Sequence, residues 1–278
     1  MTTDIRNILV HLDGPDRAEE RLLLGRQLAA VHGASVRVLY AAVPAALIVP
    51  LAGEAAGLMA EALVAFDEER RLRARRVFDA CLRQPGIRAS WSEVSDIAAQ
   101  GTFARSAMYC DLMVLGQHDP SQTGGGVPRH FVEGVLMQSG KAAIVVPYTG
   151  PVGTSFDTVV IAWKETAEAA RAVAAAIPLL KRAERVHVLS WGTEPVGVDS
   201  PWPDLPGYLA LHGITSEWER DGPEQPGVGE QILSRCADLS ADLLVMGCYG
   251  HARAREWMLG GASRTLLESM TLPVLMAH

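Results

Sequence analysis

The chain has 278 residues, a net charge of −7 and a pI near 5.6, and 49% of its residues are hydrophobic. This length predicts one large domain or two of ordinary size, with enough residues for a substantial core. The acidic balance leaves no basic surplus to meet phosphates, which argues against nucleic acid as a partner. No signal peptide and no membrane-length apolar run is visible, so we expect a cytoplasmic protein with no membrane partner.

The cysteines lie far apart, at Cys81, Cys110, Cys236 and Cys248. None forms a C-x-x-C, and no Cys/His grouping has the spacing of a zinc site, so we expect no bound metal in the protein itself. The first three fall in predicted helical patterns and are interpreted as reduced core thiols. Cys248 lies between a glycine and a tyrosine, and we expect it to be partly exposed.

The first half alternates strand and helix patterns. Apolar runs at 7–12 and 35–40 predict strands, and the periodic segment between them predicts a helix that stops at Gly33. A β-α-β order implies parallel strands with a right-handed crossover. Residues 42–54 are predicted to form a packed apolar loop, followed by a long helix to Leu82. The remaining strands are predicted at 87–94, 111–116 and 141–147, with helices at about 95–109 and 129–139.

The second half repeats this order after a linker at 148–156. Strands are predicted at 157–163, 186–191, 214–219 and 242–247, and helices from 165, at 208–212 and at 229–239, with Pro178 kinking or restarting the first helix. Three pairs of segments match between the halves: Asp111–Gly116 with Asp242–Gly247, Val135–Ser139 with Thr265–Ser269, and Ala143–Val146 with Pro273–Met276. The match indicates an internal duplication. The second half lacks most of the long helix.

The most informative segment follows the predicted strand at 242–247. Gly247 and Gly250 come first, nine residues separate Gly250 from Gly260, and a helical pattern begins near Ser263. Glycines let backbone N–H groups approach an anion, and a helix start adds unpaired N–H donors, so the segment is a candidate phosphate cradle. Any one of these glycines has an even chance of marking only a tight turn. The spacing fits neither a P-loop nor G-x-G-x-x-G.

Gly247-x2-Gly250-x9-Gly260 resembles the glycine signature of the universal stress protein family, and the strands on either side resemble that family's last two strands. The resemblance covers nearly the whole chain. It implies two tandem Rossmann-like (adenine nucleotide alpha hydrolase-like) α/β domains, at 1–149 and 155–278, each with a mostly parallel five-stranded sheet flanked by helices. It also implies a role in the stress response.

In the family, the glycine segment holds the ribose and phosphates of ATP. The resemblance therefore implies a site in the second half formed by Ala162, Lys164, Gly247, Gly250, His251, Arg253, Gly260, Gly261, Ala262 and Ser263. Gly261 stands where the family usually has Ser or Thr, and Ser263 is a candidate substitute for that hydroxyl. Lys164 stands where the family often has Asp, and an ammonium cannot accept a hydrogen bond from adenine. Backbone groups at Ala162 and Lys164 remain candidates for reading the adenine edge.

The first half has the opposite pattern. It keeps the family's aspartate as Asp13, but Gly116 is not followed by a second glycine. Alignment of the closing helices puts His130 and Phe131 where the second half has Gly260 and Gly261. We therefore predict a degenerate first-half site, represented by Asp13 and Gly116, that is filled by side chains and does not bind ATP in the family manner.

No nucleophile elbow, zinc-protease motif or kinase motif occurs, and His11 is better explained as a core residue than as a catalytic one. We therefore predict a regulatory protein that binds ATP or AMP, with Mg²⁺ as an optional companion, and no enzyme, although slow ATP hydrolysis stays conceivable. The alternative is a scaffold that binds a client protein or an apolar small molecule through residues 41–51 and the long helix. The family's pairing strand, here at 143–146 and 273–277, implies an internal pseudo-dimer; a homodimer stays open.

Overall fold

A computed structural model describes residues 4–14, 17–49, 56–82, 86–122, 126–153, 155–191, 204–220, 227–248 and 261–278. It divides into two compact units. The N-terminal unit is Ile5–Thr149, and the C-terminal unit is Gly150–His278 together with the first residues of the chain. Each unit is described by itself.

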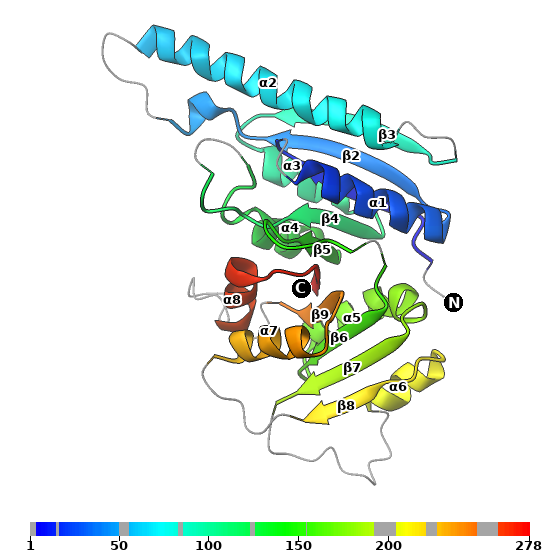
Figure 1. Ribbon diagram of the computed structural model, residues 1–278. Helices are drawn as coiled ribbons and strands as arrows, with labels where there is room; N and C mark the ends of the chain where they lie inside the picture. The colour runs from blue at the N-terminus through cyan, green and yellow to red at the C-terminus, as the bar shows by residue number, and fades with distance from the viewer. Residues whose placement is uncertain are drawn as a thin grey trace. The chain divides into compact units, whose positions relative to one another are not determined.

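The N-terminal unit contains a five-stranded sheet with the order β3-β2-β1-β4-β5 (Figure 1). Its elements, in chain order, are β1 (Asn7–Leu12), α1 (Ala18–His32), β2 (Ser35–Ala42), the 3₁₀ turn η1 (Ala45–Leu47), α2 (Ala56–Leu82), β3 (Ala89–Ser95), α3 (Ala99–Ala107), β4 (Leu112–Gly116), α4 (Phe131–Ser139) and β5 (Ala143–Val146). All four strand pairings are parallel. α1 packs against α2, and α3 packs against α4. The strands β1, β4 and β5 are almost completely buried, as a sheet covered on both faces requires.

The C-terminal unit repeats this arrangement with the strand order β10-β9-β6-β7-β8. Its elements are β6 (Thr158–Trp163), α5 (Ala167–Leu180), β7 (Arg185–Ser190), α6 (Leu205–Leu211), β8 (Glu217–Arg220), α7 (Val228–Asp238), β9 (Leu243–Gly247), α8 (Gly261–Ser269) and β10 (Val274–Ala277). These strand pairings are also parallel. The α/β class, with a parallel five-stranded order in each half, is confirmed.

The duplicated Asp-Leu-x-Val-x-Gly segment has the same structural role in both units. The Asp111 carboxylate accepts hydrogen bonds from the backbone N–H groups of Arg6 and Asn7, at 2.8 and 2.9 Å. The Asp242 carboxylate accepts from those of Asp157 and Thr158, at 3.1 and 2.8 Å. Each aspartate therefore ties the start of the fourth strand of its unit to the start of the first strand, which explains why the repeat begins with this residue.

Three sequence expectations need correction. The segment after β2 is not uniformly packed, because η1 leaves Leu47 and Ile48 more than half exposed. Pro178 does not restart the helix: it lies in the last turn of α5, where only one intrahelical N–H position is affected. Cys248 is buried, and its thiol donates to the carbonyl oxygen of Ala277 at 3.3 Å. β10 covers this cysteine, and a local sequence pattern does not reveal that.

The other three cysteines are buried and reduced, as predicted. In the part of the chain that the structure describes, no helix combines the length and the apolar character needed to cross a membrane.

Candidate functional site

The candidate site of the C-terminal unit lies at the carboxyl end of two adjacent strands. β6 and β9 run parallel and side by side, with Ala162 in register with Met246. Lys164, just after the end of β6, and Gly247, the last residue of β9, therefore reach the same edge of the sheet. In open α/β sheets this edge is where ligands bind. The register therefore brings two of the predicted site residues, far apart in the sequence, to one edge of the sheet.

Gly247 has a structural reason to be glycine that is independent of any ligand. A Cβ at this position would lie 2.4 Å from the backbone nitrogen of Ala169 and 2.6 Å from the carbonyl carbon of Glu168. Only glycine lets the first turn of α5 approach β9 this closely. That turn is fixed by Thr166, whose hydroxyl accepts a hydrogen bond from the Ala169 N–H at 3.2 Å.

The start of α8 is more open. No described atom lies within 4 Å of the position that a Cβ on Gly261 would take. Gly261 is exposed and Ala262 is half-buried, whereas Ser263 is only 5% exposed. The first N–H groups of a helix lack intrahelical acceptors, so this end of α8 offers donors to an anion. The predicted residues Gly250, His251, Arg253 and Gly260 lie outside the described residues.

On β6, the two predicted residues differ in what they can offer. Ala162 is half-buried within the ladder, in register with Leu189 on β7 and Met246 on β9. Because β6 is paired on both sides there, the backbone groups of Ala162 are directed at neighbouring strands. Lys164 lies beyond the strand with an exposed side chain, and its carbonyl oxygen accepts from the Thr166 N–H at 2.7 Å. The side chain of Lys164 is exposed to solvent. Its carbonyl oxygen already accepts a hydrogen bond within the turn and is poorly placed to contact a nucleotide base.

Arg264 on α8 contributes less positive charge than its sequence position suggests. Its Nε donates to the Glu268 carboxylate one turn along the helix, at 2.9 Å, and both side chains are about half exposed. Such an exposed pair is a solvated helix face.

The corresponding edge of the N-terminal unit is occupied by charged side chains of the protein itself. Asp13 follows β1 and is 1% exposed, and its carboxylate accepts a hydrogen bond from Nη2 of Arg21 at 3.0 Å. Arg70, from α2, donates through Nε and Nη2 to the carbonyl oxygen of Asp13, at 3.2 and 2.7 Å. Burial by itself would raise the pKa of Asp13, but the Arg21 guanidinium, with smaller contributions from its other neighbours, holds the pKa below its ordinary value.

Arg21 also closes the space beside Gly116. A Cβ on Gly116 would lie 2.6 Å from Nη1 of Arg21. The cavity that the described residues leave there has a volume of about 30 Å³ and is lined by Asp13, Arg17, Gln117 and Tyr148 among others. Sites for small organic ligands usually measure about 300 Å³ or more. The described part of this edge therefore has room for water rather than for a nucleotide.

His11 is a core residue, as predicted. Its side chain is 0% exposed, stacks on Phe131 with ring centroids 4.0 Å apart, and meets Phe103 edge-on at 5.1 Å. Nε2 lies 3.0 Å from the carbonyl oxygen of Ala41, which fits a neutral ring that donates there. Burial lowers the pKa of His11 to about 4, against an ordinary value of 6.5.

The prediction that His130 and Phe131 would fill the first-half site is only partly right. Phe131 is buried, but it packs against His11 and Phe103 beneath the sheet edge. The His130 side chain is 68% exposed and fills no interior space. The residues that do fill the edge, Arg21 and Arg70, were missed. A signal was present for Arg21, because it lies on the same helical stripe as the buried residues Gly25 and Leu28.

No protein-family model and no curated protein matches this chain. Solved structures match it over nearly its whole length. A universal stress protein from Archaeoglobus fulgidus DSM 4304 superposes with a TM-score of 0.68 at 16% identity, covering 98% of this chain and 95% of that one. A functionally unknown protein from Pseudomonas aeruginosa PAO1 gives 0.60 at 15% identity, with coverages of 98% and 92%. The cytoplasmic domain of a prokaryotic cation chloride cotransporter gives 0.54 at 11% identity, with coverages of 98% and 95%.

The chain therefore has the fold of universal stress proteins along its whole length, in the tandem form, as the glycine motif and the internal repeat predicted. Identities this low establish the shared fold alone. The cotransporter domain is built on the same fold, so function has to be argued from the site and not from the superposition.

Proposed function

We propose that this chain is a regulatory protein of the universal stress protein type that binds an adenine nucleotide, ATP or AMP, in its C-terminal unit and acts in a stress response. The observation that carries the proposal is the position of the glycine motif. β9 ends at Gly247, the motif's first glycine, and α8 begins at Gly261, directly after its last glycine. The whole motif therefore spans the connection between a buried parallel strand and a helix start, where backbone amides meet phosphates in this class of fold.

The described residues fit a phosphate-bearing ligand at one end of the site. Gly261 leaves open space, the first turn of α8 supplies N–H donors, and the exposed Lys164 ammonium lies at the same sheet edge. When bound, the nucleotide would supply the charge that these donors meet. Among the described residues, no cluster of three or more His, Cys, Asp or Glu has the arrangement of a metal site. Mg²⁺ would therefore be held chiefly through the phosphates of ATP.

The adenine end differs from the family pattern. Lys164 replaces the aspartate, and its carbonyl oxygen already accepts from Thr166. Without a carboxylate to accept from the adenine amino group, recognition of the base is weaker than recognition of the phosphates. We therefore propose that the site binds the phosphate-bearing part of the ligand most strongly and discriminates poorly between adenine and guanine nucleotides.

Equilibrium binding of labelled ATP to the full chain tests the proposal. Gly260→Trp, which adds an indole to the motif, is expected to weaken binding by about tenfold or more. Gly125→Trp is the matched control, because it adds the same group to the glycine run of the other half, and it is expected to leave binding unchanged. Equal loss in both variants, or no binding by the wild-type chain at millimolar ATP, would refute the proposal. Phosphate release in the same samples measures any slow hydrolysis.

A second candidate function is the scaffold that contacts another protein or an apolar small molecule through the N-terminal unit. The cavity at the edge of that unit is small, about 30 Å³, which gives no support to an apolar small molecule. Exposed apolar side chains on η1 and α2 support a protein contact instead.

A further inference from the structure

The indole N–H of Trp191 is a buried hydrogen-bond donor without an acceptor. Trp191 directly follows β7 and is half-buried, and its Nε1 atom is buried. Among the described residues, no acceptor makes a hydrogen bond with that atom. An indole nitrogen can only donate, so a neighbouring N–H or ammonium cannot serve as its partner. Because a buried donor is unfavourable unless an acceptor reaches it, nearly all such groups in folded proteins are paired.

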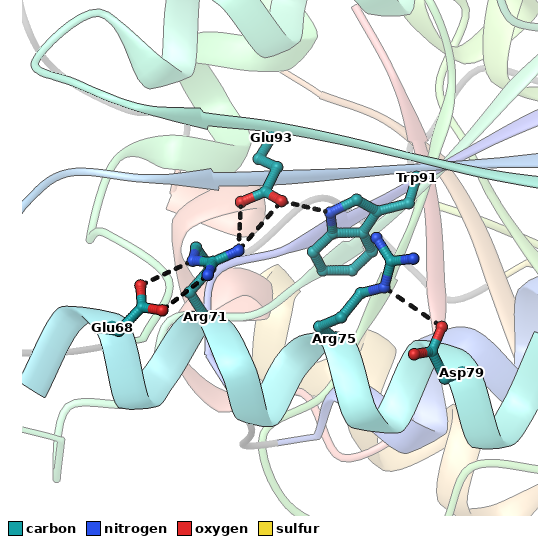
Figure 2. A network of polar contacts seen from close by, with 6 residues as sticks. All are labelled: Glu68, Arg71, Arg75, Asp79, Trp91 and Glu93. Carbon is teal, nitrogen blue, oxygen red and sulfur yellow. Dashed lines mark hydrogen bonds and ion pairs between the residues drawn. The ribbon is translucent and has the colours of Figure 1, made fainter.

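Trp91 of the N-terminal unit shows how the chain itself satisfies a donor of this kind. Figure 2 shows its indole nitrogen beside the Glu93 carboxylate, to which the N–H donates at 3.0 Å. The Arg71 guanidinium lies 3.1 Å from the same carboxylate and is also paired with Glu68. The described residues supply no comparable acceptor to Trp191. A ligand can therefore provide one.

Trp191 lies at the same edge of the sheet as the candidate nucleotide site. β6 pairs with β9 on one side and with β7 on the other (Figure 1). Trp163 is in register with Ser190. The residues that follow them, Lys164 and Trp191, therefore lie side by side at the carboxyl ends of their strands. Neighbouring strands are about 4.8 Å apart, so roughly 10 Å separate the end of β9 from the end of β7, which one nucleotide can span from phosphate to base.

The N-terminal unit makes an internal hydrogen bond at the equivalent position. The aspartate ties and the strand registers make His11 equivalent to Ala162, and Ala41 equivalent to Trp191. In the N-terminal unit, Nε2 of His11 lies 3.0 Å from the carbonyl oxygen of Ala41. Ala162 has no polar side chain that could make such a bond. The C-terminal unit therefore has an unpaired donor at a position where the N-terminal unit has a pair.

An unpaired N–H does not by itself mark a ligand site. Trp218 on β8 is also half-buried, and its Nε1 atom is also buried without a partner among the described residues. It lies in register with Val188, three residues before Trp191, so it belongs to the ladder and not to the carboxyl edge. Trp191 differs in its position beside the candidate site, and Trp218 supplies a matched control.

We propose that the indole N–H of Trp191 donates a hydrogen bond to a ring nitrogen of the base of the nucleotide that the C-terminal unit binds. The inference rests on the proposed function and adds to it the residue that contacts the base. The phosphates then lie toward α8 and the base toward β7, with Lys164 between them. Adenine and guanine both carry ring-nitrogen acceptors, so the contact forms with either base. This agrees with a site in which Lys164 stands in place of a carboxylate.

Equilibrium binding of ATP and of inorganic tripolyphosphate to the full chain tests the proposal. Trp191→Phe keeps an aromatic ring and removes the N–H. It is expected to weaken ATP binding about three- to tenfold, the net value of one hydrogen bond, and to leave the affinity for tripolyphosphate, which has no base, unchanged. Trp218→Phe makes the same change within the ladder and is expected to bind both ligands like the wild type.

Nuclear magnetic resonance of the indole N–H groups gives a direct measurement. The Trp191 resonance is assigned by its loss in Trp191→Phe. It is expected to shift when ATP or GTP is added and to stay in place when tripolyphosphate is added, whereas the Trp218 resonance is expected to stay in place with all three.

Unchanged ATP affinity in Trp191→Phe would assign the N–H to water and would refute the proposal. Equal losses for ATP and tripolyphosphate, or equal losses in Trp191→Phe and Trp218→Phe, would show that the indole supports the fold and does not contact the base. In each of these cases ATP binding by the wild-type chain would leave the proposed function intact. A wild-type chain that binds neither ligand would overturn both.

Discussion

The first strands of the two units, β1 and β6, carry different side chains at their carboxyl ends. Asp111 and Asp242 tie the equivalent residues Asn7 and Thr158, so β1 and β6 align residue by residue. His11 and Asp13 in the N-terminal unit then correspond to Ala162 and Lys164 in the C-terminal unit. The first pair is fully buried and surrounded by two arginines, whereas Ala162 is half-buried and Lys164 is exposed.

This difference shows that one fold tolerates different side chains at equivalent positions of its two units. The ties at the start of the strands are the same in both units, so the sheet does not depend on what lies at the other end. In the N-terminal unit, the buried pair Asp13 and Arg21 fills that end. In the C-terminal unit no equivalent buried pair is present among the described residues. The following predictions probe this contrast, from the largest expected effect to the smallest.

Arg21→Met is expected to lower the free energy of unfolding by about 3–5 kcal/mol, because it leaves the Asp13 carboxylate buried without its ion partner. Denaturant unfolding measures the change. Lys164→Met, at the exposed equivalent of Asp13, is the matched control and is expected to stay within about 0.5 kcal/mol. The double variant Asp13→Asn with Arg21→Met should recover much of the loss. A loss below about 1 kcal/mol for Arg21→Met alone would show that the pair does not hold the edge.

Acidification is expected to destabilise the N-terminal unit through His11. Its pKa is about 4 when folded and 6.5 ordinarily, so the unfolded chain binds the extra proton between these values. Stability is then complete above pH 6.5 and falls as the pH drops toward 4, by about 3 kcal/mol in total. Unfolding free energies measured across this range should lose most of their slope in His11→Gln. An unchanged slope would contradict the burial of a neutral ring. The pKa of Asp13 is lowered from its ordinary value of 3.8, so protonation of this carboxylate reduces the stability of the folded chain only below about that pH.

Gly247→Ala is expected to cost about 2 kcal/mol, because the added methyl would overlap backbone atoms of α5 and force that helix to shift. Thermal or denaturant unfolding of the C-terminal unit reports the loss. Gly261→Ala is the matched control, since no described residue outside its own helix turn lies within 4 Å of the added methyl, and helix propensity favours alanine there. If both variants were equally stable, the tight approach of α5 to β9 would be wrong.

Asp111→Ala and Asp242→Ala are expected to have small and similar effects, about 1 kcal/mol each, because each removes an acceptor for two backbone N–H groups at the start of a strand. Unfolding free energies of the two variants should agree with each other. Glu268→Ala, which removes only an exposed ion pair with Arg264, is expected to change stability by less than about 0.5 kcal/mol. A large difference between the two aspartate variants would show that the units are not held in the same way.

Much of the fold follows from local sequence patterns. Uninterrupted apolar runs in the sequence predicted the buried strands. Gly33 and Gly140 follow the ends of their helices and adopt the left-handed conformation that glycine favours. Strand ends were displaced by a few residues, as at β8, where the sequence predicts 214–219 and the strand is Glu217–Arg220. The repeat then predicted the order of elements along the second half, because each matched segment corresponds to an element of the first half.

The candidate site was less predictable because its contacts join distant segments. Asp13 was recognised, but its partners come from α1 and α2, and no local pattern brings Arg70 to a carbonyl 57 residues away. Gly247 was chosen for an anion, yet its closest neighbours are backbone atoms of α5. Lys164 and Gly247 were grouped through the family resemblance, and the pairing of β6 with β9 brings them to one edge of the sheet.

Hydrogen exchange of the full chain with and without saturating ATP tests the central contrast most directly. Peptides spanning residues 243–269 are expected to exchange more slowly with ATP, together with those just after β6, while peptides spanning 8–17 and 112–131 are unchanged. Slower exchange around Asp13 and Gly116, or no change anywhere in the chain, would contradict a nucleotide site confined to the C-terminal unit.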